Sequence, residues 1–211
     1  MTKRLGLAVV AALMMGGCST SGILTSTEPQ STLYTLRHAQ AVENTSNQMA
    51  KIVEIARPHV PPGFETDRIA LYTANGQKID YFAAAKWSEI LDEVLQDYTR
   101  RSVVANLPYV VAVTPDQSIV ADYRLQIKIN DLQPVYGESI SAAPVLKAAI
   151  EFTLIHLPDE RIVSSFTLSK EADSSSNNLD VIVAGMESLL QELYGRAFDK
   201  MDEHIAARKR D

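Results

Sequence analysis

The residues that could carry chemistry include one cysteine, and its position points to a modification rather than to catalysis. Cys18 follows an apolar run from Leu5 to Met15, which begins directly after two cations, Lys3 and Arg4. A basic start, a short apolar middle and small residues at the end are the features of a secretory signal peptide. The apolar run is about half the length that a membrane-spanning helix needs. We therefore expect cleavage of this segment rather than a permanent anchor helix.

The residues around Cys18 resemble the lipobox of bacterial lipoproteins, in which the cysteine thiol is acylated and the cysteine becomes the new N-terminus. Gly17 supplies the small residue that this motif has before the cysteine, and Ser19, rather than Asp, follows it. By resemblance to sorted lipoproteins, Ser19 implies the outer membrane. Each buried acyl methylene contributes about 0.8 kcal/mol, so a Cys18 that carries several acyl chains, such as palmitate, is expected to stay in the membrane. The alternative is an ordinary signal peptide with an incidental cysteine, which leaves a lone thiol in an exported protein.

No other residues have the spacing of a catalytic or metal site. The four histidines are scattered, without H-E-x-x-H or C-x-x-C spacing: His38, His59, His156 and His204. No G-x-S-x-G or Walker A motif occurs in the sequence. Neighbouring carboxylates of the kind that is usually solvated occur twice, as Asp92 with Glu93 and as Asp159 with Glu160. We therefore expect no enzymatic activity, no metal ion and no cofactor.

The composition fits a single exported domain without disulfides. Removal of residues 1–17 leaves 194 of the 211 residues, which is enough for one domain with its own core. The mature chain then has 18 basic and 26 acidic residues, a net charge of −8 with neutral histidines. This acidic balance argues against binding to nucleic acid and against electrostatic binding to anionic lipid. With a single cysteine, the burial of hydrophobic residues, 46% of the chain, must hold the fold together.

Residues 18–32 are predicted to connect the acylated cysteine to the folded body. After Cys18 this segment is rich in Ser, Thr and Gly and has no hydrophobic periodicity, which is typical of a flexible tether. Fully extended, it spans roughly 45 Å at about 3.3 Å per residue. We assign residues 33–211 to a single domain.

Strand patterns follow the tether. The clearest is 123–130, where apolar and polar residues alternate strictly, which predicts a strand with one buried face. The pair Asn75-Gly76 between two apolar-rich runs predicts a hairpin, because both residues tolerate positive φ. A second hairpin is predicted from 147–157 and 162–169. Shorter strands are predicted at 33–36, 52–56 and 109–113.

Two segments have the period of an amphipathic helix. One runs from Ala84 to about Arg101 and contains Trp87, which we interpret as a packing residue rather than a ligand platform. The other runs from about Leu179 to Ala207. The predicted fold class is therefore α+β, an antiparallel sheet of about five or six strands with two amphipathic helices packed on one face.

The order of these elements resembles a known family. The residues that carry the resemblance are the lipobox, a Tyr-x-Leu strand at Tyr34, a proline-rich loop at Pro61, the hairpin 69–82, a helix opening on Trp87 with Leu91, and Ala121-Asp122-Tyr123-Arg124-Leu125 at the start of the alternating strand. This arrangement is similar to the ABC-type transport auxiliary lipoprotein family, the PqiC-like proteins. The similarity spans nearly all of the mature chain.

The resemblance implies a lipoprotein anchored in the outer membrane and facing the periplasm. It implies partners as well, an MCE-domain protein and ABC transporter components, in intermembrane lipid transport. In this family such a component docks the transport apparatus and catalyses no reaction. Apart from the acylated Cys18, no residue with a defined chemical role is carried over to this sequence. Exposed strand edges and a long final helix also permit a homo-oligomer.

Two other functions fit the same sequence features. The first is a periplasmic lipid-binding carrier with a cavity between the sheet and the helices, although the same apolar faces more simply predict a filled core. The second is a structural or assembly lipoprotein of the outer membrane that is unrelated to ABC transport. Gene neighbours distinguish this last function, because a permease, an ATPase and an MCE protein alongside would argue against it.

Overall fold

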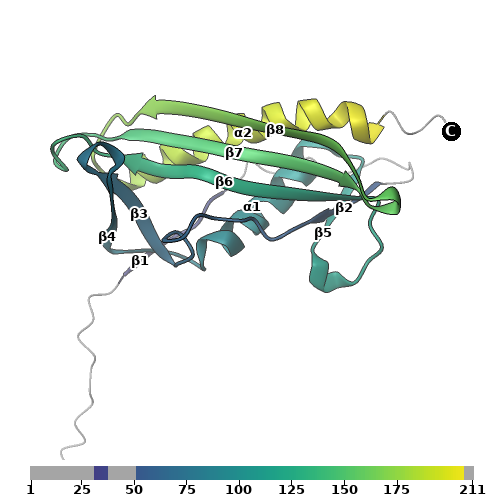
Figure 1. The fold of residues 1–211 in the computed structure, drawn as a ribbon. Coiled ribbons are helices and arrows are strands. Elements are labelled where there is room, and N and C mark those ends of the chain that lie inside the picture. Colours follow the sequence, from purple (N-terminus) through teal and green to yellow (C-terminus); the bar gives the residue numbers. More distant parts are fainter. Residues whose placement is uncertain (1–30, 38–50, 207–211) are drawn as a thin grey trace, which may run out of the picture.

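The computed structural model describes residues 31–37 and 51–206, which form one curled sheet with two helices (Figure 1). Cys18, His38, the predicted signal and the predicted tether up to residue 30 lie outside these residues. The elements, in chain order, are β1 (Thr32–Tyr34), β2 (Lys51–Ile55), β3 (Arg68–Thr73), η1 (Ala74–Gly76), β4 (Lys78–Trp87), α1 (Leu91–Asn106), β5 (Val110–Val113), η2 (Pro115–Gln117), β6 (Tyr123–Val135), β7 (Val145–His156), η3 (Leu157–Asp159), β8 (Arg161–Asp173) and α2 (Leu179–Ala206).

The long strand β6 organises the sheet, because strands pair with both of its edges. Along one edge β7 runs antiparallel for the whole length, from Tyr123 opposite His156 to Val135 opposite Val145, and β8 continues beyond β7. The other edge is shared by two shorter groups of strands. Near its start, β6 pairs in parallel with β2, and β2 pairs with β5 on its other side. At its end, β6 pairs with β3, which is followed in the sheet by β4 and then β1.

The alternation along β6 buries one face of the sheet, as predicted. Its inward residues are less than 4% exposed, namely Tyr123, Leu125, Ile127 and Ile129. The paired strand β7 continues this apolar surface with Leu146, Ala148, Ile150, Phe152 and Leu154. Full burial of one such aliphatic or aromatic side chain contributes about 1.5–3 kcal/mol, so this face is the main source of stability.

Both helices lie behind the long strands in Figure 1 and cover the buried face. The stripe predicted for α2 is confirmed, with buried side chains that include Ile182, Met186, Leu190, Leu193, Ala197 and Met201. The shorter α1 packs between α2 and the strands β2 and β5. A hydrogen bond of 2.8 Å from the Tyr34 hydroxyl to Asp180 ties β1 to the first turn of α2.

The first helix begins later than its sequence pattern predicts. Residues 84–87 belong to β4, and α1 starts only at Leu91 after Ile90, which has extended backbone angles. Tertiary pairing overrides the local helical period here, because Trp87 lies beside Tyr34 of β1 and its N–H donates to the carbonyl of Asp67. The interpretation of Trp87 as a packing residue is confirmed, since its side chain is only 2% exposed.

The α+β class and the helices packed on the sheet are confirmed, while the sheet itself is larger and more mixed than expected. Among the described residues it has eight strands rather than five or six, and it contains parallel pairs in addition to antiparallel ones. The predicted hairpins are both antiparallel, β3 with β4 and β7 with β8. The parallel pairs join short strands that are distant in sequence, which strand alternation alone cannot specify.

Candidate functional site

The chemistry-bearing side chains lie in separate places and serve the fold. Within residues 31–37 and 51–206, no group of three or more His, Cys, Asp or Glu side chains could hold a metal ion. His59 forms an isolated bridge with β6, and Tyr123 donates to the backbone carbonyl of His204 at 3.4 Å. His156 Nδ1 lies 2.6 Å from Asp159 Oδ1 in the turn between β7 and β8. This hydrogen bond lowers the pKa of the Asp159 carboxyl.

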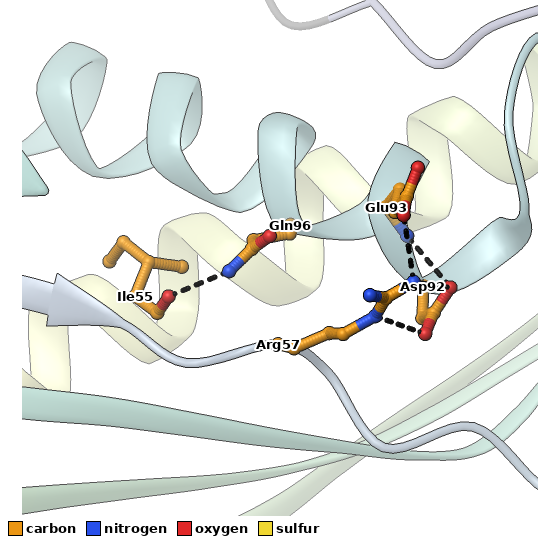
Figure 2. Close-up of polar contacts among 5 residues, drawn as sticks. All are labelled: Ile55, Arg57, Asp92, Glu93 and Gln96. Atoms are coloured by element: carbon orange, nitrogen blue, oxygen red, sulfur yellow. Dashed lines mark hydrogen bonds and ion pairs between the residues drawn. The ribbon is translucent and has the colours of Figure 1, made fainter. Parts of the chain in front are cut away.

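The carboxylates Asp92 and Glu93 form a bridge to the segment after β2 (Figure 2). Arg57 Nε donates to Asp92 at 2.5 Å, and Arg57 Nη2 donates to Glu93 at 2.9 Å. The hydrogen bond to Asp92 is also the main reason why the pKa of Arg57 is raised. One turn further along α1, Gln96 Nε2 donates to the carbonyl of Ile55 at 3.0 Å. These contacts attach the chain after β2 to the start of α1, and they contain no reactive arrangement.

The space between the sheet and the helices is filled by aromatic side chains. Tyr194 stacks edge-on against both Phe152 of β7 and Tyr98 of α1, each with ring centroids 5.2 Å apart. The Tyr194 hydroxyl lies 2.9 Å from Thr99 Oγ1. Because the Thr99 hydroxyl donates to the carbonyl of Leu95, Tyr194 is the donor in this pair. Burial raises the pKa of Tyr194 well above its usual range.

Two hollows lie outside this core, between β8 and α2. The first has a volume of about 410 Å³, and its lining includes Leu146, Lys170, Ala172, Val181, Gly185 and Ser188. The second has a volume of about 400 Å³ and is lined by Ser164, Phe166, Asp199, Lys200, Glu203 and His204. Both are placed where β8 forms the outer margin of the sheet, since β8 pairs with β7 and with no other described strand.

The hairpin pattern of β7 and β8 does not predict this margin, although the sequence of β8 carries a signal for it. Its outward face has only small polar residues at Ser165, Thr167 and Ser169, and its inward face contains Ser164 and Lys170. Polar residues that interrupt the apolar inward face of a strand, beside a polar outward face, are typical of the edge of a sheet. The helix side of the hollows has a signal too, the small residues Ala184, Gly185 and Ser188 on one side of α2.

Exposed apolar side chains also lie in the loop between η2 and β6. Val120 is 92% exposed, and Ile119 beside it is 47% exposed. Val111 on the neighbouring strand β5 is 46% exposed. This surface lies far along the sheet order from β8, because β5 is the outermost strand on the other edge of β6.

The body of the protein matches a known family over most of its length. The model of the ABC-type transport auxiliary lipoprotein component matches residues 34–196, from β1 into α2. The chain belongs to this family. The family is that of an auxiliary component and not a known family of enzymes. No helix among the described residues of this auxiliary lipoprotein is long and apolar enough to cross a membrane.

Solved structures share the fold of this auxiliary lipoprotein. A protein of Xanthomonas campestris, described under the family model DUF330, is 19% identical with a TM-score of 0.65, and the match covers 79% of this chain and 92% of that chain. A second structure, described as an uncharacterized protein, is 13% identical with a TM-score of 0.63, and the match covers 82% of this chain and 99% of that chain. No curated protein matched the chain. At these identities the structures show the fold alone.

Proposed function

We propose that this auxiliary lipoprotein is a non-enzymatic docking subunit of an MCE/ABC-type intermembrane lipid transport system. The observation that carries the proposal is the family match over residues 34–196, which covers almost the whole described body. In this proposal, residues 1–17 are a signal peptide that is removed. Cys18 is the acylated anchor, residues 18–32 are the tether, and residues 33–211 are the docking domain.

Several features of the body support binding rather than catalysis. The side chains that could act as acids, bases or ligands, such as Asp92 and His156, are engaged in local contacts that hold loops and helix ends. The surface offers a strand edge and exposed apolar residues instead, which are features that contact other proteins. The acidic chain favours an anchor of lipid on Cys18 over electrostatic attachment to anionic membranes.

The proposed partners are an MCE-domain protein and ABC transporter components in the periplasm and inner membrane. The test is affinity capture of the tagged full chain from membranes in mild detergent, followed by mass spectrometry. We expect these components to be enriched over a capture with a tagged lipoprotein of another family. Recovery of only unrelated proteins, at levels equal to the control, contradicts the proposal.

A lipid carrier is the competing function, and the filled centre of the protein argues against it. The aromatic rings of Tyr98, Phe152 and Tyr194 occupy the space between the sheet and the helices that a buried acyl chain would need. We therefore expect lipid extraction of the purified body, followed by mass spectrometry, to find no stoichiometric lipid. A bound lipid near one per chain would favour the carrier instead.

A further inference from the structure

The free edge of β8 is long and poorly protected. The strand has 13 residues, pairs with β7 over its length and has no strand on its other side among the described elements. Such an edge presents unpaired backbone N–H and C=O groups, and proteins usually block it with Pro, bulges or inward charges. β8 contains no proline, and the one register shift in its pairing with β7 lies near its start, between Ile162 and Ser164, so the rest of the strand has none. Its inward charge, Lys170, is neutralised by an ion pair with Glu192 of α2.

The inward side of this edge is incompletely covered. On β7, Phe152 and Leu154 are at most 1% exposed, whereas Phe166 and Ala172 of β8 are only partly buried against the core. Each of these two β8 residues lines one of the hollows. The core therefore opens to solvent along β8, at two places.

The two openings fit the repeat of an extended chain. Phe166 and Ala172 are six residues apart, so their side chains point the same way and lie roughly 20 Å apart at about 3.3 Å per residue. A strand added to β8 would have the same repeat. Two of its inward side chains, six positions apart, would then face the two hollows.

The hollows differ in chemistry. The first has an apolar part formed by Leu146, Ala172, Val181 and Leu189, and the paired Lys170 and Glu192 are among its polar lining residues. Its apolar part suits a small apolar side chain. In the second, Asp199 and Glu203 have no ion-pair partner among the described residues, and Lys200 lies over the ring of Phe166 at 5.7 Å. Two carboxylates and one lysine give the hollow a formal net negative charge with His204 neutral, which favours a cation from outside.

We propose that the free edge of β8 receives an extended segment of the docking partner as an additional strand. The segment places an apolar side chain in the hollow beside Gly185 and a Lys or Arg in the hollow beside Asp199 and Glu203. Backbone hydrogen bonds along β8 give affinity, and the two hollows select the sequence. This inference deepens the proposed docking function and rests on it.

The experiment uses a library of random ten-residue peptides displayed on phage, selected on the immobilised mature chain. The enriched peptides are synthesised, and their affinity is measured by fluorescence anisotropy. We expect sequences that alternate, with a basic residue six positions from an apolar one. Hydrogen exchange in the complex should slow in β8, because its free backbone groups become paired.

Matched variants locate the site. Ser188→Trp fills the first hollow from an exposed position on α2, and Gln191→Trp adds the same side chain on α2 outside both hollows. We expect Ser188→Trp to weaken peptide binding at least about tenfold and Gln191→Trp less than about twofold. The double change Asp199→Asn with Glu203→Gln should weaken the basic peptides while their neutral analogues bind as before. Equal melting temperatures of the variants show that the fold is retained.

Other occupants give different results. If Val120→Ser weakens peptide binding and Ser188→Trp does not, the exposed loop is the docking surface and the proposal for β8 is overturned. A second outcome is that no peptides are enriched, while the chain associates with itself and Ser188→Trp abolishes this self-association. A second copy then occupies the edge, and the proposal of a partner segment is also overturned. Capture of MCE and transporter components by the Ser188→Trp variant at the level of the unaltered chain leaves docking intact and refutes the role of β8. Peptide binding without capture of those components supports the strand site and contradicts the proposed function.

Discussion

Gly185 of α2 and Leu146 of β7 touch so closely that no side chain fits between them. A Cβ atom at Gly185 would overlap Cδ1 of Leu146, whose own side chain is only 2% exposed. The first half of α2 can therefore approach the sheet only because position 185 has no side chain.

We expect Gly185→Ala to destabilise the protein by about 1–3 kcal/mol, because helix or leucine must move in a packed core. Gly195 is a matched control on the same helix, since a Cβ there meets nothing within 4 Å. Gly195→Ala should stabilise the protein by about 0.5–1 kcal/mol through helix propensity. Urea unfolding of both variants measures the two effects, and equal effects of the two substitutions would contradict the close contact.

The buried tyrosines make stability fall at alkaline pH. Burial raises the pKa values of Tyr98 and Tyr194 in the folded state above the ordinary tyrosine value of 10.0, whereas the unfolded chain ionises near that value. Above about pH 10 the unfolded state therefore holds fewer protons than the folded state, and the free energy of unfolding decreases as pH rises. Each buried tyrosine contributes up to about 1.4 kcal/mol per pH unit.

The substitution Tyr194→Phe isolates the contribution of Tyr194 to the loss of stability at alkaline pH. Thr99 keeps its bond to the carbonyl of Leu95, so we expect a loss of about 1 kcal/mol at pH 7. Above pH 10 the variant should lose stability less steeply than the unaltered protein. Chemical unfolding between pH 8 and about pH 11 tests this. Identical slopes for both proteins would show that Tyr194 is not protected from ionisation.

The bridge of Arg57 to Asp92 and Glu93 is expected to be modest but measurable. The Arg57 side chain is 49% exposed, which limits the contribution of each ion pair through solvent screening. Arg57→Ala should lower the free energy of unfolding by about 1 kcal/mol, because it leaves the two neighbouring carboxylates at the start of α1 without their shared cation. Arg100→Ala, which removes a pair within α1, should cost about 0.3 kcal/mol. Unfolding at low and high salt measures both effects, and the loss of stability caused by each substitution should become smaller as salt rises.

The proposed anchor is tested in cells with Cys18→Ser. We expect the unaltered protein to incorporate labelled palmitate and to sediment with outer membranes, and the variant to do neither. A Ser19→Asp variant provides the matched control for sorting, because it retains the thiol and should still be labelled. Absence of label on the unaltered protein contradicts the anchor and leaves the family match as the remaining support for attachment.

The sequence patterns that predicted structure correctly are those in which neighbouring residues strongly favour one local backbone conformation. Strict alternation placed β6, the Asn75-Gly76 pair placed a hairpin where both residues have positive φ, and one long stripe placed α2. These signals are local, so they do not depend on which segments later meet.

The missed features depend on partners that are distant in the chain. Residues 84–87 have a helical period but join β1 and β3, and Ala84 itself adopts a φ of +52° where β4 bends. The parallel pairs of β2 with β5 and β6 also join distant segments. The open margin at β8 could be suspected from its polar inward residues, whereas the hollows require the position of α2 and were not predictable.

The position of β1 has a mechanical consequence. The chain enters the sheet at Thr32, and from β1 to β8 the strands follow one another side by side as β1, β4, β3, β6, β7 and β8. A pull applied at the N-terminal end is therefore transmitted crosswise, from strand to strand, before it reaches the opposite margin. The first link on that route is the short, three-residue pairing of β1 with β4, so overload would release the entry strand before the strands beyond it.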